Sequence, residues 1–251
     1  MEGEVLASLR SVSKRFGPVV ALDAVDLDIL HGSSTALIGS NGAGKTTLLR
    51  ILAGVYRPSE GTAVLGEGNI VDHRRRIGVM TESTGLHVRL TAWENIRFHA
   101  RLFGVEDGEA RRRTERHAGP LGMLGALDRR TEGFSRGMRQ KTALMRALVH
   151  EPDLLLLDEP TAGLDITSAR AVRTLIQSLV EEGRGVVWST HDLSAATLCD
   201  RLVLVHNAKV VANGPLSTLL ASSSVADAEA LHELHTMEAT REFLEGVDVV
   251  S

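Results

Sequence analysis

The chain has 251 residues and a formal net charge of −4, which predicts one large domain or a core with a small subdomain and argues against a broad nucleic-acid-binding surface. No apolar run approaches the roughly 20 residues that span a bilayer, and no secretory segment is visible at the N-terminus. The single cysteine, Cys199, excludes a disulfide framework and fits a reducing compartment, so we expect it to be a packed core residue.

The N-terminal third of the sequence predicts several strands. Residues 5–30 alternate apolar and polar side chains, which indicates two or three strands with a turn near Gly17-Pro18. Residues 36–38 form a short apolar run of the kind that a buried strand has, and residues 60–65 and 76–80 predict further short strands.

A glycine-rich loop follows the run at 36–38 and precedes residues 47–53, whose apolar side chains recur at helical spacing. Strand, loop and helix in this order are the context of a phosphate-binding loop, in which backbone N–H groups and the helix N-terminus face an anion. Lys45 can reach the outer phosphates, and Thr46 can ligate the accompanying Mg²⁺. A plain glycine-rich turn is the alternative, and the context argues against it. The candidate nucleotide-binding residues are Gly39, Ser40, Asn41, Gly42, Ala43, Gly44, Lys45, Thr46 and Thr47.

A helical stretch separates this loop from the next motif. Thr91-Ala92-Trp93-Glu94 has the pattern of a capping box and predicts a helix that continues to about Phe103. The helical pattern continues to about residue 150, with breaks at Gly104, Gly119-Pro120 and Gly133.

An acidic pair ends the continuous apolar run at residues 154–157, which predicts a central parallel strand buried on both faces. Ligands of open α/β sheets bind at the carboxyl edge, where Asp158 would lie. We therefore predict that Asp158 holds Mg²⁺ and that Glu159 is the base that polarises the attacking water. A capping Asp-Glu-Pro turn is the alternative, which the upstream phosphate loop disfavours.

Together these motifs resemble the nucleotide-binding subunit of ABC transporters, over most of the chain from about Leu6 to Gly214. Residues 134–140 resemble the family signature Leu-Ser-Gly-Gly-Gln, with Phe134, Arg136 and Met138 as departures. The resemblance implies that Ser135 and Gly137, which open an amphipathic helix, cap the ATP held by an opposite subunit. A plain helix cap is the alternative reading of Ser135.

Other positions follow the family order. Phe16 matches the aromatic residue that stacks on adenine, and His191 matches the histidine that contacts the γ-phosphate. Residues 162–165 look like the loop that communicates across the dimer. Glu82 stands where the family usually has a Gln that senses Mg²⁺ and the membrane partner. The alternatives are a core aromatic for Phe16, a structural histidine for His191 and a surface carboxylate for Glu82.

The resemblance implies an α/β fold with a P-loop NTPase (RecA-like) core, an N-terminal antiparallel β-subdomain and an inserted α-helical subdomain. We predict an ATP-binding core at 1–90 and 150–215, a helical subdomain at 91–149 and a tail at 216–251. Within the tail, residues 226–247 predict a helix, with a strand as a further element, and the sequence identifies no chemistry there. A hairpin turn is predicted at residues 206–209.

The implied function is that of an ATPase subunit with ATP and Mg²⁺, which closes as a homodimer or heterodimer and powers export through a separate membrane-spanning permease. It would lie at the cytoplasmic face of the membrane. The stretch at 90–96 resembles drug- and sodium-export ATPases. One rival is an ABC ATPase acting on ribosomes or DNA, which a single cassette without a heptad run disfavours. The other is a regulatory module that binds ATP without turnover, which the complete set of catalytic positions disfavours.

Overall fold

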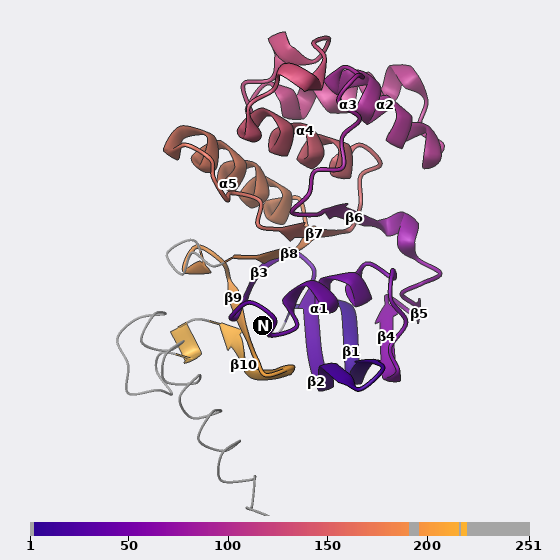
Figure 1. Cartoon of the computed structure of the whole chain (residues 1–251), viewed down its shortest axis with the longest axis vertical. Helices are drawn as coiled ribbons and strands as arrows, with labels where there is room; N and C mark the ends of the chain where they lie inside the picture. The colour runs from indigo at the N-terminus through magenta and orange to yellow at the C-terminus, as the bar shows by residue number, and fades with distance from the viewer. Residues whose placement is uncertain (1–2, 191–195, 216, 220–251) are drawn as a thin grey trace, which may run out of the picture.

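The computed structural model describes residues 3–190, 196–215 and 217–219, in which the strands form two sheets (Figure 1). The first is an antiparallel sheet with the order β2-β1-β4-β5. Its two long strands meet at the turn predicted near Gly17-Pro18. The strands are β1 (Val5–Phe16), β2 (Val19–Leu30), β4 (Glu60–Leu65) and β5 (Gly68–Asn69).

The second sheet has six strands in the order β10-β9-β3-β8-β7-β6. All its neighbours pair in parallel except β9 and β10, which form the predicted hairpin. Asn207 and Ala208 connect them with φ values of 45° and 66°, as a two-residue hairpin turn of type I′ requires. The strands are β3 (Ser33–Ile38), β6 (Ile77–Met80), β7 (Leu154–Asp158), β8 (Gly185–Ser189), β9 (Arg201–His206) and β10 (Lys209–Pro215).

Strand β7 is buried on both faces, as its apolar run predicted, and its side chains alternate between two cores. Leu154 and Leu156 pack in the core shared with α1 (Lys45–Leu52) and the antiparallel sheet. Leu155 and Leu157 pack in the core shared with the other helices. Because successive strand residues point to opposite faces, one run of leucines joins the two layers.

The remaining long helices are α2 (Ala92–Leu102), α3 (Asp107–Ala118), α4 (Arg136–Leu148) and α5 (Ile166–Glu181). In Figure 1, α2, α3 and α4 gather at the end of the molecule opposite β1 and β2. The capping box at Thr91 is confirmed, since its hydroxyl accepts from Glu94 N at 3.0 Å while Glu94 accepts from Thr91 N at 2.8 Å. Short 3-10 turns lie at Arg74–Arg76, Leu124–Ala126 and Thr131–Gly133.

The predicted P-loop NTPase fold is confirmed, whereas the subdomain boundaries stay predictions. Most of the predicted tail at 216–251, including its helix at 226–247, lies outside the described residues. Among the helices described, none is both long and apolar enough to cross a membrane.

Cys199 is confirmed as a core residue, because it is 9% exposed and burial raises the pKa of its thiol to about 12.

Three histidines of the helical layer are held neutral by their surroundings. Burial lowers the pKa of His99, His117 and His150 to about 4 in each case. The His150 ring stacks on Phe103 with centroids 3.8 Å apart, so it has little room for a hydrated charge. A histidine whose pKa is lower in the folded than in the unfolded chain makes its full contribution to stability above about pH 6.5, the pKa of the unfolded chain. That contribution is lost as the pH falls towards the pKa of the folded chain.

We predict that the free energy of unfolding falls as the pH drops from about 6.5 towards 4, because the unfolded chain binds these protons first. Urea unfolding at several pH values measures this dependence. The variant His117→Gln should show a shallower slope than the wild type, whereas Gln177→Ala, which removes no titratable group from an exposed position, should not. Equal slopes in the wild type and His117→Gln would contradict the assignment.

Candidate functional site

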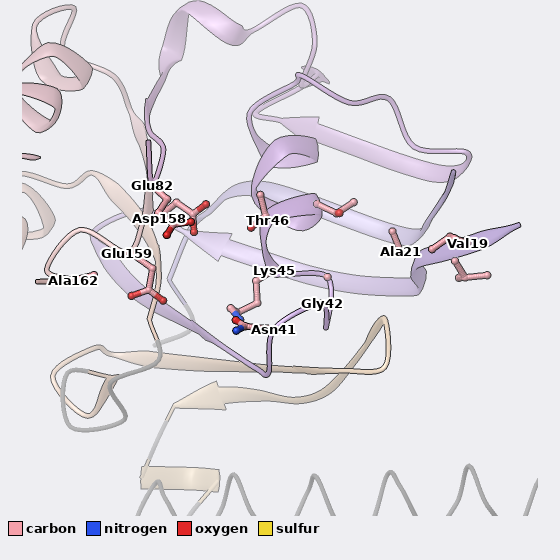
Figure 2. Close-up of a pocket in the computed structure, with 13 residues that line it drawn as sticks. Val19, Ala21, Asn41, Gly42, Lys45, Thr46, Glu82, Asp158, Glu159 and Ala162 are labelled. Carbon is pink, nitrogen blue, oxygen red and sulfur yellow. The ribbon is translucent and has the colours of Figure 1, made fainter. Parts of the chain in front are cut away.

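A cleft of about 810 Å³ opens at the carboxyl edge of the parallel strands (Figure 2). Residues from the beginning of β2, the glycine-rich loop, the loop after β6 and the end of β7 line it. The volume suits a nucleotide-sized ligand. The lining residues are Val19, Val20, Ala21, Asn41, Gly42, Gly44, Lys45, Thr46, Thr47, Glu82, Asp158, Glu159 and Ala162.

The glycine-rich loop joins the end of β3 to α1, as predicted. Two of its residues, Gly39 and Ser40, do not line the cleft. Their carbonyl oxygens accept hydrogen bonds from the Lys45 ammonium, at 2.6 Å and 3.0 Å. A Cβ at Gly39 would lie 2.2 Å from the carbonyl oxygen of Val205, so only glycine fits there. Ala43 is buried in the core and does not line the cleft.

Lys45 is buried and lines the cleft, and two effects act on its pKa. Burial, the larger effect, lowers the pKa from its ordinary value, and the negative charges of Glu159 and Asp158 oppose that shift. The carbonyl oxygens of the loop and the two carboxylates therefore compensate a buried ammonium. A ligand with phosphate oxygens would offer it stronger, charged acceptors.

Asp158 and Glu159 leave the end of β7 in different directions and share one neighbour, Ser189 of β8. The Ser189 hydroxyl donates to Asp158 Oδ1 at 2.5 Å, and its oxygen accepts from the backbone N–H of Glu159 at 3.1 Å. Glu159 has a φ of 52°, a left-handed conformation that is uncommon outside glycine. Ser189 thus fixes the carboxylate of one acidic residue and the backbone of the other.

Glu82 lines the same cleft from the loop after β6. That loop is tied to two helices. Arg146 of α4 donates to the carbonyl oxygens of Thr84 at 2.8 Å and Gly85 at 2.9 Å. Asn95 of α2 accepts from the backbone N–H of His87 at 2.8 Å. A displacement of these helices would therefore move the segment that carries Glu82.

The oxygen donors predicted to hold Mg²⁺ meet in this cleft. Thr46, Glu82 and Asp158 all line it, and Figure 2 shows the two carboxylates on the side of the cleft that faces Thr46. Hydroxyl and carboxylate oxygens suit Mg²⁺, which proteins commonly bind through one or two carboxylates together with substrate phosphates. Accordingly, the described residues contain no complete cage of three or more His, Cys, Asp or Glu ligands. The donor set fits a metal that arrives with a phosphate ligand.

Phe16, the predicted adenine-stacking residue, does not line the cleft. Its side chain is 43% exposed and contacts Tyr56 edge-on, with ring centroids 5.3 Å apart. Its strand partner Val19 does line the cleft, which places Phe16 beside the rim. The ring is thus near the cleft and accessible, and its stacking role stays a prediction.

Ser135 and Gly137 also lie outside this cleft, at the beginning of α4. The Ser135 oxygen accepts from the backbone N–H of Met138 at 3.2 Å, which is the helix-cap geometry considered as the alternative. A capping hydroxyl still has its hydrogen to donate, so the cap and a role in binding phosphate are compatible. His191 falls within 191–195, outside the described residues, and its role stays a prediction.

The structure adds residues that sequence reasoning missed. Val19, Val20 and Ala21 line the cleft because the turn after β1 returns the chain to it, a tertiary effect without a local signal. Ser189 could have been singled out from the sequence, since it directly follows the apolar residues Val186-Val187-Trp188 of a predicted strand. Its register opposite Asp158 was the information that the sequence lacked.

Comparisons with known proteins point the same way. The family profile described as ABC transporter matches residues 22–162. The ABC transporter ATP-binding protein NatA of Bacillus subtilis (strain 168) is 39% identical over 232 residues, which cover 88% of this chain and 94% of the relative. The cobalt import ATP-binding protein CbiO of Rhodobacter capsulatus is 37% identical, over 81% of this chain and 76% of the relative.

Among solved structures, the dimeric post-hydrolysis state of the ATP-binding cassette MJ0796 bound to ADP and Pi superposes with a TM-score of 0.78. It is 26% identical and covers 84% of this chain and 99% of its own.

The variant Lys45→Ala should weaken ATP binding about tenfold or more, because the loop loses its charged donor to the outer phosphates. Calorimetric titration with ATP measures the affinity directly. The chain has only four lysines, so no neighbour replaces the charge easily. Lys209→Ala, at an exposed lysine, is the matched control and should bind as the wild type does. An unchanged affinity in Lys45→Ala would remove the residue from the phosphate site.

Proposed function

This chain belongs to the ABC transporter family as an ATP-binding, ATP-hydrolysing subunit, and from that premise we propose that it powers export through a separate membrane-spanning partner. ATP would close two such subunits head to tail, and hydrolysis would reopen them. The cycle would act on a permease, which would hold the subunit at the cytoplasmic face of the membrane.

The polar residues in and next to the cleft have proposed roles in hydrolysis. Lys45 binds the outer phosphates, and the N–H groups of the glycine-rich loop surround them. Thr46, Asp158 and Glu82 would hold Mg²⁺, which would neutralise charge on the phosphates. Glu159 accepts a proton from the attacking water. Ser189 keeps Asp158 oriented, since its hydroxyl donates to that carboxylate.

The remaining proposed contacts lie at the edges of the cleft. Phe16 would stack on the adenine, because its exposed ring stands beside the rim. His191 would contact the γ-phosphate from the segment that follows β8.

The dimer is the central part of the proposal, and one observation carries it. Ser135 and Gly137, which the family signature assigns to ATP, do not line the cleft of their own chain. They stand at the N-terminus of α4, where backbone N–H groups and the helix dipole favour an anion. A second subunit would bring its own triphosphate to these donors. Whether that subunit is a copy or a relative is open to experiment.

A membrane partner is supported by the surface of α2. Phe98 and Leu102, one helical turn apart, are 55% and 60% exposed, and Val88 in the preceding loop is half exposed. Exposed apolar side chains on one helix face are typical of an interface. Because Asn95 and Arg146 tie the Glu82 loop to α2 and α4, a partner on these helices would act on the cleft through Glu82.

The direction of transport rests on the sequence alone. Residues 90–96 resemble those of exporting ATPases, whereas one relative is named for cobalt import. Export is therefore the proposed direction, and import by the same ATPase cycle is the alternative that a transport assay must separate.

The variant Glu159→Gln should keep ATP binding and lose turnover about a hundredfold or more, because an amide can hold the water but cannot take its proton. ATP-dependent dimers should accumulate, which light scattering after gel filtration would detect. Glu181→Gln, at an exposed carboxylate at the end of α5, is the matched control. Near-normal steady-state hydrolysis in Glu159→Gln would exclude the base role.

A tagged chain purified from solubilised membranes should carry a separate multi-span protein with it. The double variant Phe98→Asp and Leu102→Asp should release that protein, because two charges would enter an apolar contact. Val55→Asp, at another exposed apolar residue, is the control and should retain it.

In inside-out vesicles containing this complex, ATP should drive accumulation of radioactive sodium or a lipophilic fluorescent cation. Loss of label preloaded into the vesicles would instead indicate import. Recovery of a ribosome or DNA with the tagged chain, in place of a membrane protein, would contradict the proposal.

A further inference from the structure

The backbone at Glu159 needs support from its surroundings. Its φ of 52° lies in the left-handed region, which side chains with a Cβ rarely adopt and which persists only where neighbouring contacts hold it. On one side the N–H of Glu159 donates to Ser189, to the hydroxyl oxygen at 3.1 Å and to the carbonyl oxygen at 3.3 Å. Strand β8 therefore holds the backbone N–H of Glu159 in place.

Gln140 of α4 contacts the turn on the carbonyl side of Glu159. Its amide nitrogen donates to the carbonyl oxygen of Ala162 at 3.1 Å and, over a longer 3.4 Å, to that of Glu159. The N–H of Ala162 closes the turn by donating to the Glu159 carbonyl at 3.2 Å. Gln140 is 4% exposed, and its Oε1 has no hydrogen-bond partner in the described part of the chain. The hydrogen bonds of this buried amide are thus directed at the turn that carries Glu159.

The rest of the loop packs on the first turn of α4. Gly163 has a φ of 69°, and a Cβ there would lie 3.0 Å from the Arg136 guanidinium. Similarly, a Cβ at Gly137 would lie 3.1 Å from Leu164. Arg136 and Gly137 therefore sit in close contact with residues that follow Glu159 by only a few positions. The helix and the loop form one packed unit.

Gln140 can influence hydrolysis only indirectly. It does not line the nucleotide cleft, where Glu159 and Ala162 lie (Figure 2). It faces a second cavity of about 380 Å³ together with Glu82 and Arg136. A substitution at Gln140 should therefore leave the ATP contacts intact and reach the reaction through the loop.

We propose that Gln140 is a positioning residue for hydrolysis, which holds the loop from Glu159 to Leu164 on α4 so that the Glu159 carboxylate faces the attacking water. The inference rests on the proposed role of Glu159 as the base. It means that the helix whose N-terminus is offered to a partner's nucleotide also supports the base of its own chain.

The test compares Gln140→Met with Gln140→Glu. Methionine conserves the volume and removes both donors, whereas glutamate conserves the shape and turns an acceptor towards two carbonyl oxygens. We expect ATP affinity within about twofold of the wild type in both. Turnover at saturating ATP should fall roughly tenfold to a hundredfold, with the larger loss in Gln140→Glu, because small displacements of a catalytic group are costly. Gln177→Met and Gln177→Glu, at an exposed glutamine of α5, are the controls.

Thermal unfolding is measured alongside, and if one variant is unfolded at the assay temperature the other decides. Turnover within about twofold of the wild type in a folded variant overturns the proposal. So does an ATP affinity that falls as much as turnover does, because that result indicates general damage to the cleft. If Glu159→Gln loses turnover while the Gln140 variants keep it, only the positioning role fails. If Glu159→Gln also keeps turnover, the base assignment itself is wrong.

Discussion

The register of three parallel strands is the constraint on which the candidate site depends. Ser189 of β8 is paired with Leu37 of β3 on one side and with Asp158 of β7 on the other. The glycine-rich loop begins two residues after Leu37, so this pairing sets the phosphate loop and the acidic pair at the same edge of the sheet. A slip of one residue in either pairing would turn Asp158 or Ser189 to the opposite face and separate the groups that meet in the cleft. The alternating leucines of β7 oppose such a slip, because each face of the strand packs in a different core.

Two residues in the cleft have conformations or environments that are unfavourable in an isolated peptide. Lys45 is buried, and Glu159 has a left-handed backbone. Each is stabilised by contacts from another part of the chain: loop carbonyls and carboxylates for Lys45, and Ser189 with Gln140 for Glu159. Such arrangements are expected where a site is prepared for a ligand that supplies the missing interactions. Through Gln140 they connect a helix outside the cleft to the residue that is proposed as the base inside it.

Much of this could be predicted from the sequence, where the signal was local. The glycine-rich loop, the apolar run before Asp158, the capping box at Thr91 and the hairpin at residues 206–209 each depend on neighbouring residues, and each is confirmed as structure. The contacts that depend on tertiary placement could not be read in this way. Ala43 belongs to the motif but packs in the core, and Val19 lines the cleft only because β2 returns to it. Ser189 and Gln140 were visible as residues, but their partners lie 31 and 22 positions away.

The central claim is that one chain holds the phosphates and another completes the site through its α4 N-terminus. Mixing Ser135→Arg subunits with Lys45→Ala subunits tests it most directly, because a mixed pair would have one site damaged twice and one intact. Steady-state ATP hydrolysis by purified mixed pairs is the measurement. The account predicts that part of the wild-type activity returns, although each variant alone is inactive. Mixed pairs without activity, when each variant is active beside a wild-type subunit, would contradict it, since each chain would then use its own Ser135.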